Sequence, residues 1–209
     1  MLPPDVFRRQ DESDDADFYT QPRFVTHIDA AAVAAVTDLY RETVGAGADV
    51  LDLMTSHVSH LPEDVAYGRV AGLGMNAAEL AANPALTERI VQNLNTDPRL
   101  PYADASFDAV LICVSVQYLT QPVEVFAEIA RVLRPGSAER PGGALVVTFS
   151  NRCFPTKAVR AWAALGDAGH SALVGIYVRE AGGFGEPDLR AHTPRGGDPL
   201  FSVVARRES

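Results

Sequence analysis

The sequence predicts a single α/β domain built on a mostly parallel sheet. Apolar runs of strand length alternate with segments whose apolar side chains recur at helical spacing, which is typical of parallel strands joined by helical crossovers. Two of the runs, at 107–116 and 142–149, are almost continuously apolar, as in strands buried on both faces. A chain of 209 residues suits one domain.

The predicted elements alternate along the chain. Residues 29–44 have helical spacing of apolar side chains, and Gly45-Ala46-Gly47 ends this helix. Strands are predicted at 50–53, 69–73, 107–116 and 142–149, with a short apolar segment at 86–91 and a terminal strand at 201–205 that could pair antiparallel. Further helices are predicted at 76–82, 123–133, 157–165 and 172–180. Ligands of such sheets bind at the carboxyl ends of the strands.

Charge and composition restrict the class of partner. The chain has 18 Lys and Arg against 27 Asp and Glu, and a net charge of -9 argues against a nucleic acid partner. We expect no membrane partner, because no apolar stretch approaches the about 18 residues of a spanning helix. The cysteines, Cys113 and Cys153, lie in apolar contexts and indicate a cytoplasmic protein. The acidic run at 11–17 is interpreted as a solvated arm without a chemical role.

Three stretches carry a family resemblance. They read LPYADASFDAV at 100–110, EIARVLRPG at 128–136 and DPLFSVVARR at 198–207. In order and spacing they resemble class I S-adenosylmethionine-dependent methyltransferases of the type 11 group. The resemblance implies a Rossmann-like three-layer sandwich whose seven-stranded, mostly parallel sheet has an antiparallel last strand. It also implies an N-terminal arm and lid helix at 1–46, a core at 47–209, and S-adenosyl-L-methionine as cofactor.

The sequence departs from this family at the cofactor site. The family pattern VLDLGCGTG reads VLDLMTSHV at 50–58, so Asp52 is kept while Met54, Ser56 and Val58 replace the glycines that allow close approach of the backbone to a ligand. After the next strand, Gly74-Met75-Asn76 lacks the carboxylate that receives the ribose hydroxyls, although Glu79 could reach in from the helix.

The resemblance nevertheless implies a set of site residues. The expected cofactor contacts are Asp52, Met54, Ser56 and His57 for the amino-acid part, Gly74, Met75 and Asn76 for the ribose, Asn93 and Leu94 for adenine, and also Ser115. The expected substrate contacts are Tyr19 and Arg23 on the arm, with Gln117, Tyr118, Asn151 and Arg152 after the fourth and fifth strands. Some of these residues have a structural role as the alternative. Ser115 and Asn151 could cap the helix or loop that follows them, and Arg152 could form a surface ion pair.

His57 and His60 are three positions apart, but no third metal ligand is near in sequence, so we predict ligand-contacting or loop-structuring histidines and no metal centre.

Two functions remain open from the sequence. The first is a methyltransferase acting on a small molecule, and the second is a non-catalytic binding or interaction module that keeps the scaffold, motivated by the missing glycines. Nicotinamide-dependent redox chemistry is disfavoured, because no G-x-G-x-x-G turn follows the first strand. The sequence assigns neither a catalytic residue nor an oligomeric state.

Overall fold

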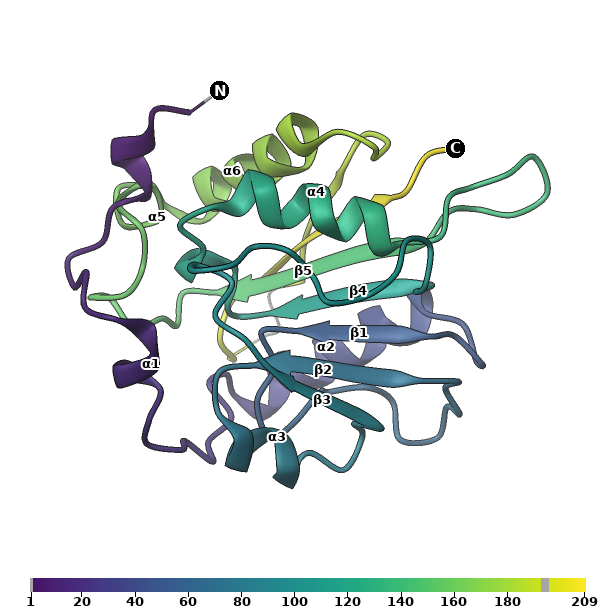
Figure 1. Cartoon of the computed structure of the whole chain (residues 1–209), viewed down its shortest axis with the longest axis horizontal. Coiled ribbons are helices and arrows are strands. Elements are labelled where there is room, and N and C mark those ends of the chain that lie inside the picture. Colours follow the sequence, from purple (N-terminus) through teal and green to yellow (C-terminus); the bar gives the residue numbers. More distant parts are fainter. Residues whose placement is uncertain (1, 193–195) are drawn as a thin grey trace.

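A computed structural model describes residues 2–192 and 196–209. Its centre is a seven-stranded sheet with the order β3-β2-β1-β4-β5-β7-β6 (Figure 1). The strands are β1 (Val50–Leu53), β2 (Val70–Gly74), β3 (Glu88–Val91), β4 (Ala109–Cys113), β5 (Ala144–Ser150), β6 (Asp188–Ala191) and β7 (Leu200–Arg206). Strands β1 to β5 pair in parallel, and β7 is antiparallel to both of its neighbours. The predicted fold class is confirmed.

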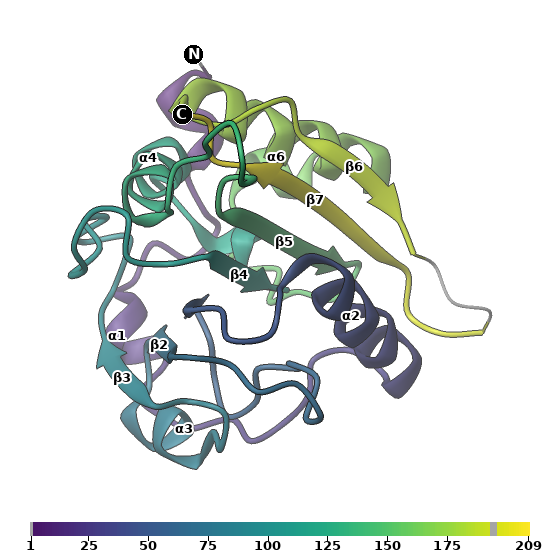
Figure 2. The ribbon, with the colours of Figure 1, turned by 90° about the vertical axis from the view of Figure 1, so that its right-hand side faces the viewer.

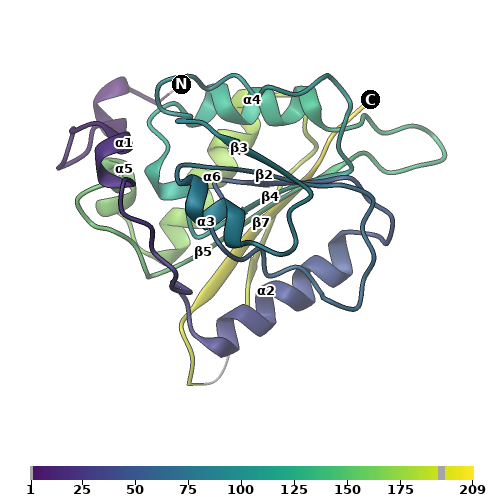
Figure 3. The ribbon, with the colours of Figure 1, turned by 60° about the horizontal axis from the view of Figure 1, so that its bottom comes forward.

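Helices cover both faces of this sheet. Helix α2 (Ala30–Thr43) lies on one face, and α4 (Pro122–Val132) and α6 (Asp167–Ala181) lie on the other (Figures 2 and 3). The shorter elements are η1 (Pro4–Phe7), α1 (Asp15–Phe18), α3 (Ala77–Ala82), η2 (Val116–Tyr118) and α5 (Arg160–Ala163). None of the helices within the described ranges is long and apolar enough to cross a membrane.

Alternate residues of the central strands enter different cores, which explains the continuous apolar runs. On β4, Val110 and Ile112 pack into the core beneath α4 and α6, whereas Ala109 and Leu111 pack into the core beneath α2. All four are buried. Because both faces of the strand are covered, no polar position interrupts the run.

Some elements differ from the sequence-based expectation. The predicted helix 157–165 is reduced to α5, and the predicted strand 107–116 ends at Cys113. Strand β6 was not predicted, because all four of its residues are exposed at the sheet edge and show no apolar pattern. The connection from β1 to β2, residues 54–69, contains no helix.

The acidic run is not a solvated arm throughout. Asp15 is buried, and its carboxylate pairs with Arg9 at 2.6 Å and with Lys157 at 3.4 Å. Lys157 lies in the segment after β5, so the N-terminal arm (residues 2–29) is held across the carboxyl ends of the strands (Figure 1). Helix α2, which we had expected to belong to a lid, packs instead against the sheet.

Candidate functional site

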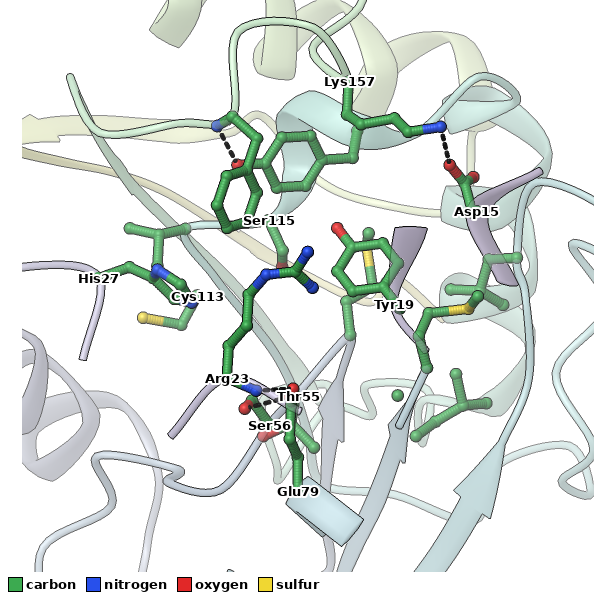
Figure 4. A pocket seen from close by; sticks show the side chains of 18 of the residues that line it. Asp15, Tyr19, Arg23, His27, Thr55, Ser56, Glu79, Cys113, Ser115 and Lys157 are labelled. Atoms are coloured by element: carbon green, nitrogen blue, oxygen red, sulfur yellow. Dashed lines mark hydrogen bonds and ion pairs between the residues drawn. The ribbon is translucent and has the colours of Figure 1, made fainter. Parts of the chain in front are cut away.

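A cavity of about 330 Å³ opens where the strand order reverses. Strands β1 and β4 are neighbours, but the chain continues from β1 to β2 on one side and from β4 to β5 on the other. The crevice at such a switch point is the usual ligand site of an open α/β sheet. The ends of these strands form the floor of the cavity, and the N-terminal arm forms its roof (Figure 4).

Asp52 brings a carboxyl group to the floor of the cavity. It lies on β1, is 2% exposed, and accepts a hydrogen bond from the Thr55 hydroxyl at 2.6 Å. Burial raises the pKa of Asp52 to about 7, against the opposing effect of the Ser59 and Thr55 hydroxyls. The ionisation of this carboxyl group is therefore sensitive to any charge placed beside it.

The cavity wall holds strained backbone. Met54, His60 and Val114 have φ values of 59°, 55° and 45°, and all three line the cavity. This left-handed region favours glycine, and other residues there cost about 1–3 kcal/mol each. Met54 stands where the family pattern has its first glycine. The loop thus keeps a glycine-like backbone while the Met54 side chain packs against the core.

The end of β2 approaches this loop closely. A Cβ on Gly74 would collide with the carbonyl oxygen of Thr55. After β2, Glu79 in the first turn of α3 brings a carboxylate to the cavity wall. It is 7% exposed, accepts the Ser56 hydroxyl at 2.5 Å, and accepts the backbone N–H of Arg23 at 2.7 Å. Glu79 therefore ties the β1 loop and the arm together beside the cavity.

A buried ionic network anchors the roof. One oxygen of Asp15 accepts from Arg9 at 2.6 Å, and the other accepts from the Asn95 amide at 2.8 Å. The ammonium group of Lys157 also donates to the Ser13 carbonyl at 2.8 Å, and its side chain is 1% exposed. Figure 4 shows the Lys157–Asp15 pair at one end of the cavity. The arm is thus fixed in place over the strand ends.

Aromatic rings line the side of the cavity next to β4 and β5. Tyr118 and Phe154 are stacked with centroids 5.9 Å apart, and the Tyr118 hydroxyl accepts the backbone N–H of Phe154 at 2.9 Å. The His27 ring meets Phe154 edge-on at 5.4 Å. Burial lowers the pKa of His27, which favours the neutral imidazole. This half of the cavity suits a flat, largely apolar group.

Most of the predicted site residues lie on this one cavity. Those that line it are Tyr19, Arg23, Asp52, Met54, Ser56, His57, Gly74, Met75, Asn93, Leu94, Ser115, Tyr118 and Arg152. Arg152 also forms the surface ion pair that was its alternative, with Asp198 at 2.8 Å. Across the described ranges, no cluster of three or more His, Cys, Asp or Glu side chains is arranged to hold a metal ion.

Three of the predicted contacts are turned away from the cavity. The Asn76 side chain caps α3 by accepting from Ala78 and Glu79. Gln117 is 1% exposed and donates to the Val114 carbonyl at 2.9 Å. Asn151 is exposed and accepts from the Ser150 hydroxyl at 3.2 Å. Each of these side chains hydrogen-bonds a neighbouring part of the chain, and none of the three is among the residues that line the cavity.

Sequence reasoning missed several members of the wall. Lys157 and Phe154 follow β5, and the rule that parallel strand ends gather at a site was the only available signal for them. His27 lies in an irregular segment between α1 and α2 and had no signal at all.

Comparison with known proteins agrees with the geometry. The pattern of a family described as "Methyltransferase domain" matches residues 45–138. Residues 45–138 of this chain are thus similar to a methyltransferase domain. A demethylmenaquinone methyltransferase of Mycobacterium sp. (strain JLS) is 35% identical over an alignment 114 residues long, which covers 46% of this chain and 47% of that protein. The chain thus spans about half the length of the curated relatives it matches.

Solved structures share the fold at low sequence identity. A putative methyltransferase in complex with the Haloferax volcanii Trm112 activator superposes with a TM-score of 0.61 at 15% identity, covering 86% of this chain and 90% of that one. Phosphoethanolamine N-methyltransferase 2 of Haemonchus contortus, in complex with S-adenosyl-L-methionine, gives 0.60 at 13% identity, covering 84% and 52%. The cyclase SpnF gives 0.59 at 18% identity, covering 83% and 80%. A cyclase among them illustrates that this fold is not restricted to methyl transfer.

Proposed function

We propose that the chain is an S-adenosyl-L-methionine-dependent methyltransferase that acts on a small molecule. The observation that carries the proposal is an open cavity at the switch point of a class I methyltransferase fold, with the Asp52 carboxyl group on its floor. Met54 and Val58, the residues that replace family glycines, line this cavity and do not fill it. The departure from the glycine pattern therefore leaves room for a ligand.

The groups on the cavity wall fit the chemistry of the cofactor. S-adenosyl-L-methionine carries an ammonium group, a carboxylate, a ribose diol and adenine, and the wall offers the acids Asp52 and Glu79 and the amide of Asn93. The hydroxyl of Ser115 is buried without a partner in the described chain, as a polar atom that awaits a ligand would be. The donor set therefore matches this class of cofactor.

We assign the parts of the cofactor by position in the sheet. Asp52 and the loop 54–57 would hold the amino-acid part, Gly74 and Met75 with Glu79 would face the ribose, and Asn93 with Leu94 would face adenine. When bound, the cofactor supplies a methyl group already activated on a sulfonium. The chain needs only to align the acceptor and exclude water, which the anchored arm does from above.

The second candidate is a binding module that performs no methyl transfer. Two observations favour this binding module. The Met54 backbone is strained, and both oxygens of Glu79 already accept hydrogen bonds from the protein itself. It predicts that Asp52→Asn leaves ligand binding unchanged.

Calorimetry around pH 7 separates these candidates. The protein is titrated with S-adenosyl-L-homocysteine in two buffers of different ionisation enthalpy. Because burial raises the pKa of Asp52 to about 7, an ammonium group beside it should lower that pKa and release part of a proton. We expect this release in the wild type and in the control Asp38→Asn, an exposed position outside the cavity, and we expect Asp52→Asn to bind about tenfold more weakly with no release. Failure of the wild type to bind at millimolar ligand contradicts the proposal.

A further inference from the structure

The guanidinium group of Arg23 is the unneutralised cation of the cavity wall. It donates to the backbone carbonyls of Phe18 at 2.9 Å and of Gln21 at 3.5 Å, and no carboxylate within residues 2–192 or 196–209 forms an ion pair with it. The wall has three other arginine and lysine side chains, and each of them forms an ion pair. Arg9 pairs with Asp15, Arg152 with Asp198, and Lys157 with both Asp11 and Asp15. Arg23 thus has donors to spare at the centre of the cavity (Figure 4).

Several contacts hold Arg23 in this position. Its backbone N–H donates to Glu79 at 2.7 Å, so that carboxylate binds the main chain of Arg23 and leaves its side chain free. The guanidinium carbon lies 4.5 Å from the centroid of the Phe18 ring, 5.4 Å from that of Phe154 and 5.6 Å from that of Tyr19. A guanidinium stacked on rings loses little freedom when it binds a planar anion, and its fork matches a carboxylate.

Ser115 supplies a second unmet polar group. It precedes η2 at the end of β4, is 8% exposed, and its hydroxyl has no hydrogen-bond partner in the described chain. A buried hydroxyl without a partner costs about 1–3 kcal/mol, so a ligand atom that accepts from Ser115 would remove this cost. Ser115 and Arg23 line the same cavity.

The walls between these groups are flat and apolar. Tyr118 and Phe154 are stacked at an interplanar angle of 28°, and Tyr19 faces the cavity from the arm. Rings of this kind favour a planar, aromatic ligand, and one cation together with one free hydroxyl favours a ligand with one anionic and one neutral polar group.

We propose that the methyl acceptor is a hydroxylated aromatic carboxylic acid whose carboxylate pairs with Arg23 and whose ring lies against Tyr118 and Phe154. Its hydroxyl oxygen would form the bond to the methyl carbon as the bond from that carbon to the sulfonium of the cofactor breaks. This leaves S-adenosyl-L-homocysteine, and the hydroxyl proton would pass to solvent. This inference deepens the proposed function and rests on it. The competing source of a carboxylate for Arg23 is the cofactor itself. The position of the guanidinium argues against the cofactor as that source. It stacks on Phe154, which follows β5 and so lies on the side of the switch point away from the β1 loop.

The test uses aromatic acids and their neutral counterparts. Salicylate, para-hydroxybenzoate and para-coumarate, each paired with its carboxamide, are titrated calorimetrically into the full-length protein with and without S-adenosyl-L-homocysteine. At least one acid should bind the wild type about tenfold or more tightly than its carboxamide, as a charge-assisted hydrogen-bonded pair provides. Arg23→Gln should abolish this preference, because glutamine keeps the backbone donor to Glu79 but lacks the charge. Arg23→Lys should keep part of it.

Arg41→Gln is the matched control. Arg41 lies on α2, outside the cavity, and its side chain is 45% exposed and paired with Asp64, so the acid preference should persist in this variant. Circular dichroism and urea unfolding confirm that each variant is folded.

Other outcomes overturn the inference. Equal affinity for acids and carboxamides, binding of neither, or an unchanged preference in Arg23→Gln contradicts it. If Arg23→Gln weakens the binding of S-adenosyl-L-homocysteine but not that of methylthioadenosine, which lacks the amino-acid part, then Arg23 holds the cofactor carboxylate and the inference is wrong. If the wild type binds no S-adenosyl-L-homocysteine, the proposed function fails, and the titrations without it still decide whether Arg23 selects acids.

Discussion

Replacing Asp15 by asparagine should detach the arm from the strand ends. The substitution keeps the size of the side chain and removes the charge that neutralises Arg9 and Lys157, whose side chains are 7% and 1% exposed. Removing one partner of a buried ion pair costs about 3–5 kcal/mol, because a charge stays buried without compensation. Lys157 retains Asp11 at 3.2 Å, and asparagine can still accept hydrogen bonds. We therefore expect a loss at the lower end, about 3 kcal/mol.

Asp17→Asn is the matched control. It makes the same chemical change two positions along the same acidic run, but Asp17 is exposed, so its effect should stay within about 0.5 kcal/mol. The measurement is the free energy of unfolding in urea, together with amide exchange of residues 11–19. A local release of the arm appears in the exchange even where global unfolding changes little. If Asp15→Asn matches Asp17→Asn in both measurements, the buried network does not hold the arm.

Three further predictions concern the cavity floor. Gly74→Ala should cost at least about 2 kcal/mol in urea unfolding, since its Cβ would collide with the Thr55 carbonyl, whereas Gly45→Ala, with nothing within 4 Å, should not destabilise the protein. Ser115→Ala should leave the free protein as stable or up to about 1 kcal/mol more stable, because it removes an unpartnered hydroxyl, and should weaken ligand binding in the same titrations. The pKa of Asp52 is raised from 3.8 to about 7, so the folded state binds the carboxyl proton more tightly than the unfolded state does. This protonation stabilises the fold fully below about pH 4, and the stabilisation is lost as the pH rises to about 7. Wild-type unfolding free energy should therefore fall over this range relative to Asp52→Asn, and parallel curves would contradict the buried, protonated state.

The strands and covering helices could be predicted because their signals are local. Burial of β4 and β5 on both faces leaves continuous apolar runs in the sequence, and the amphipathic face of α4 recurs at helical spacing. Strand β6 could not be predicted, because all four of its residues are exposed. An edge strand held mainly by backbone hydrogen bonds to β7 leaves no hydrophobic pattern to read.

The cavity residues were predictable only in part, and Gln117 shows why. The sequence places it at the end of the fourth strand, where this fold exposes groups to ligands. The strand is followed by η2, a 3₁₀ turn with about three residues per turn, so Ser115 and Tyr118 face the cavity while Gln117 points back to Val114. The sequence thus places Gln117 correctly along the chain, but the direction of its side chain depends on the short turn η2.

The roof depends on contacts that no local pattern carries. Lys157 and Ser13 are 144 positions apart, and the acidic composition around Ser13 is the same whether the run is solvated or docked. Only the folded chain shows that Asp15 is buried while Asp17, two positions later, is exposed. Composition therefore identified the charge of the arm but not its partner.

The same distinction applies to the ligand's charge. A net charge of -9 argues against a polyanion such as nucleic acid, whose many phosphates interact with the whole surface. A single carboxylate inside the cavity is governed by the groups within contact distance, because charges beyond about 8–10 Å are largely screened at physiological salt. There the arm places its acids against Arg9 and Lys157 and presents Arg23 to the cavity. An acidic protein can thus bind an acidic ligand, because the groups that contact the ligand, and not the net charge, set the preference for acids.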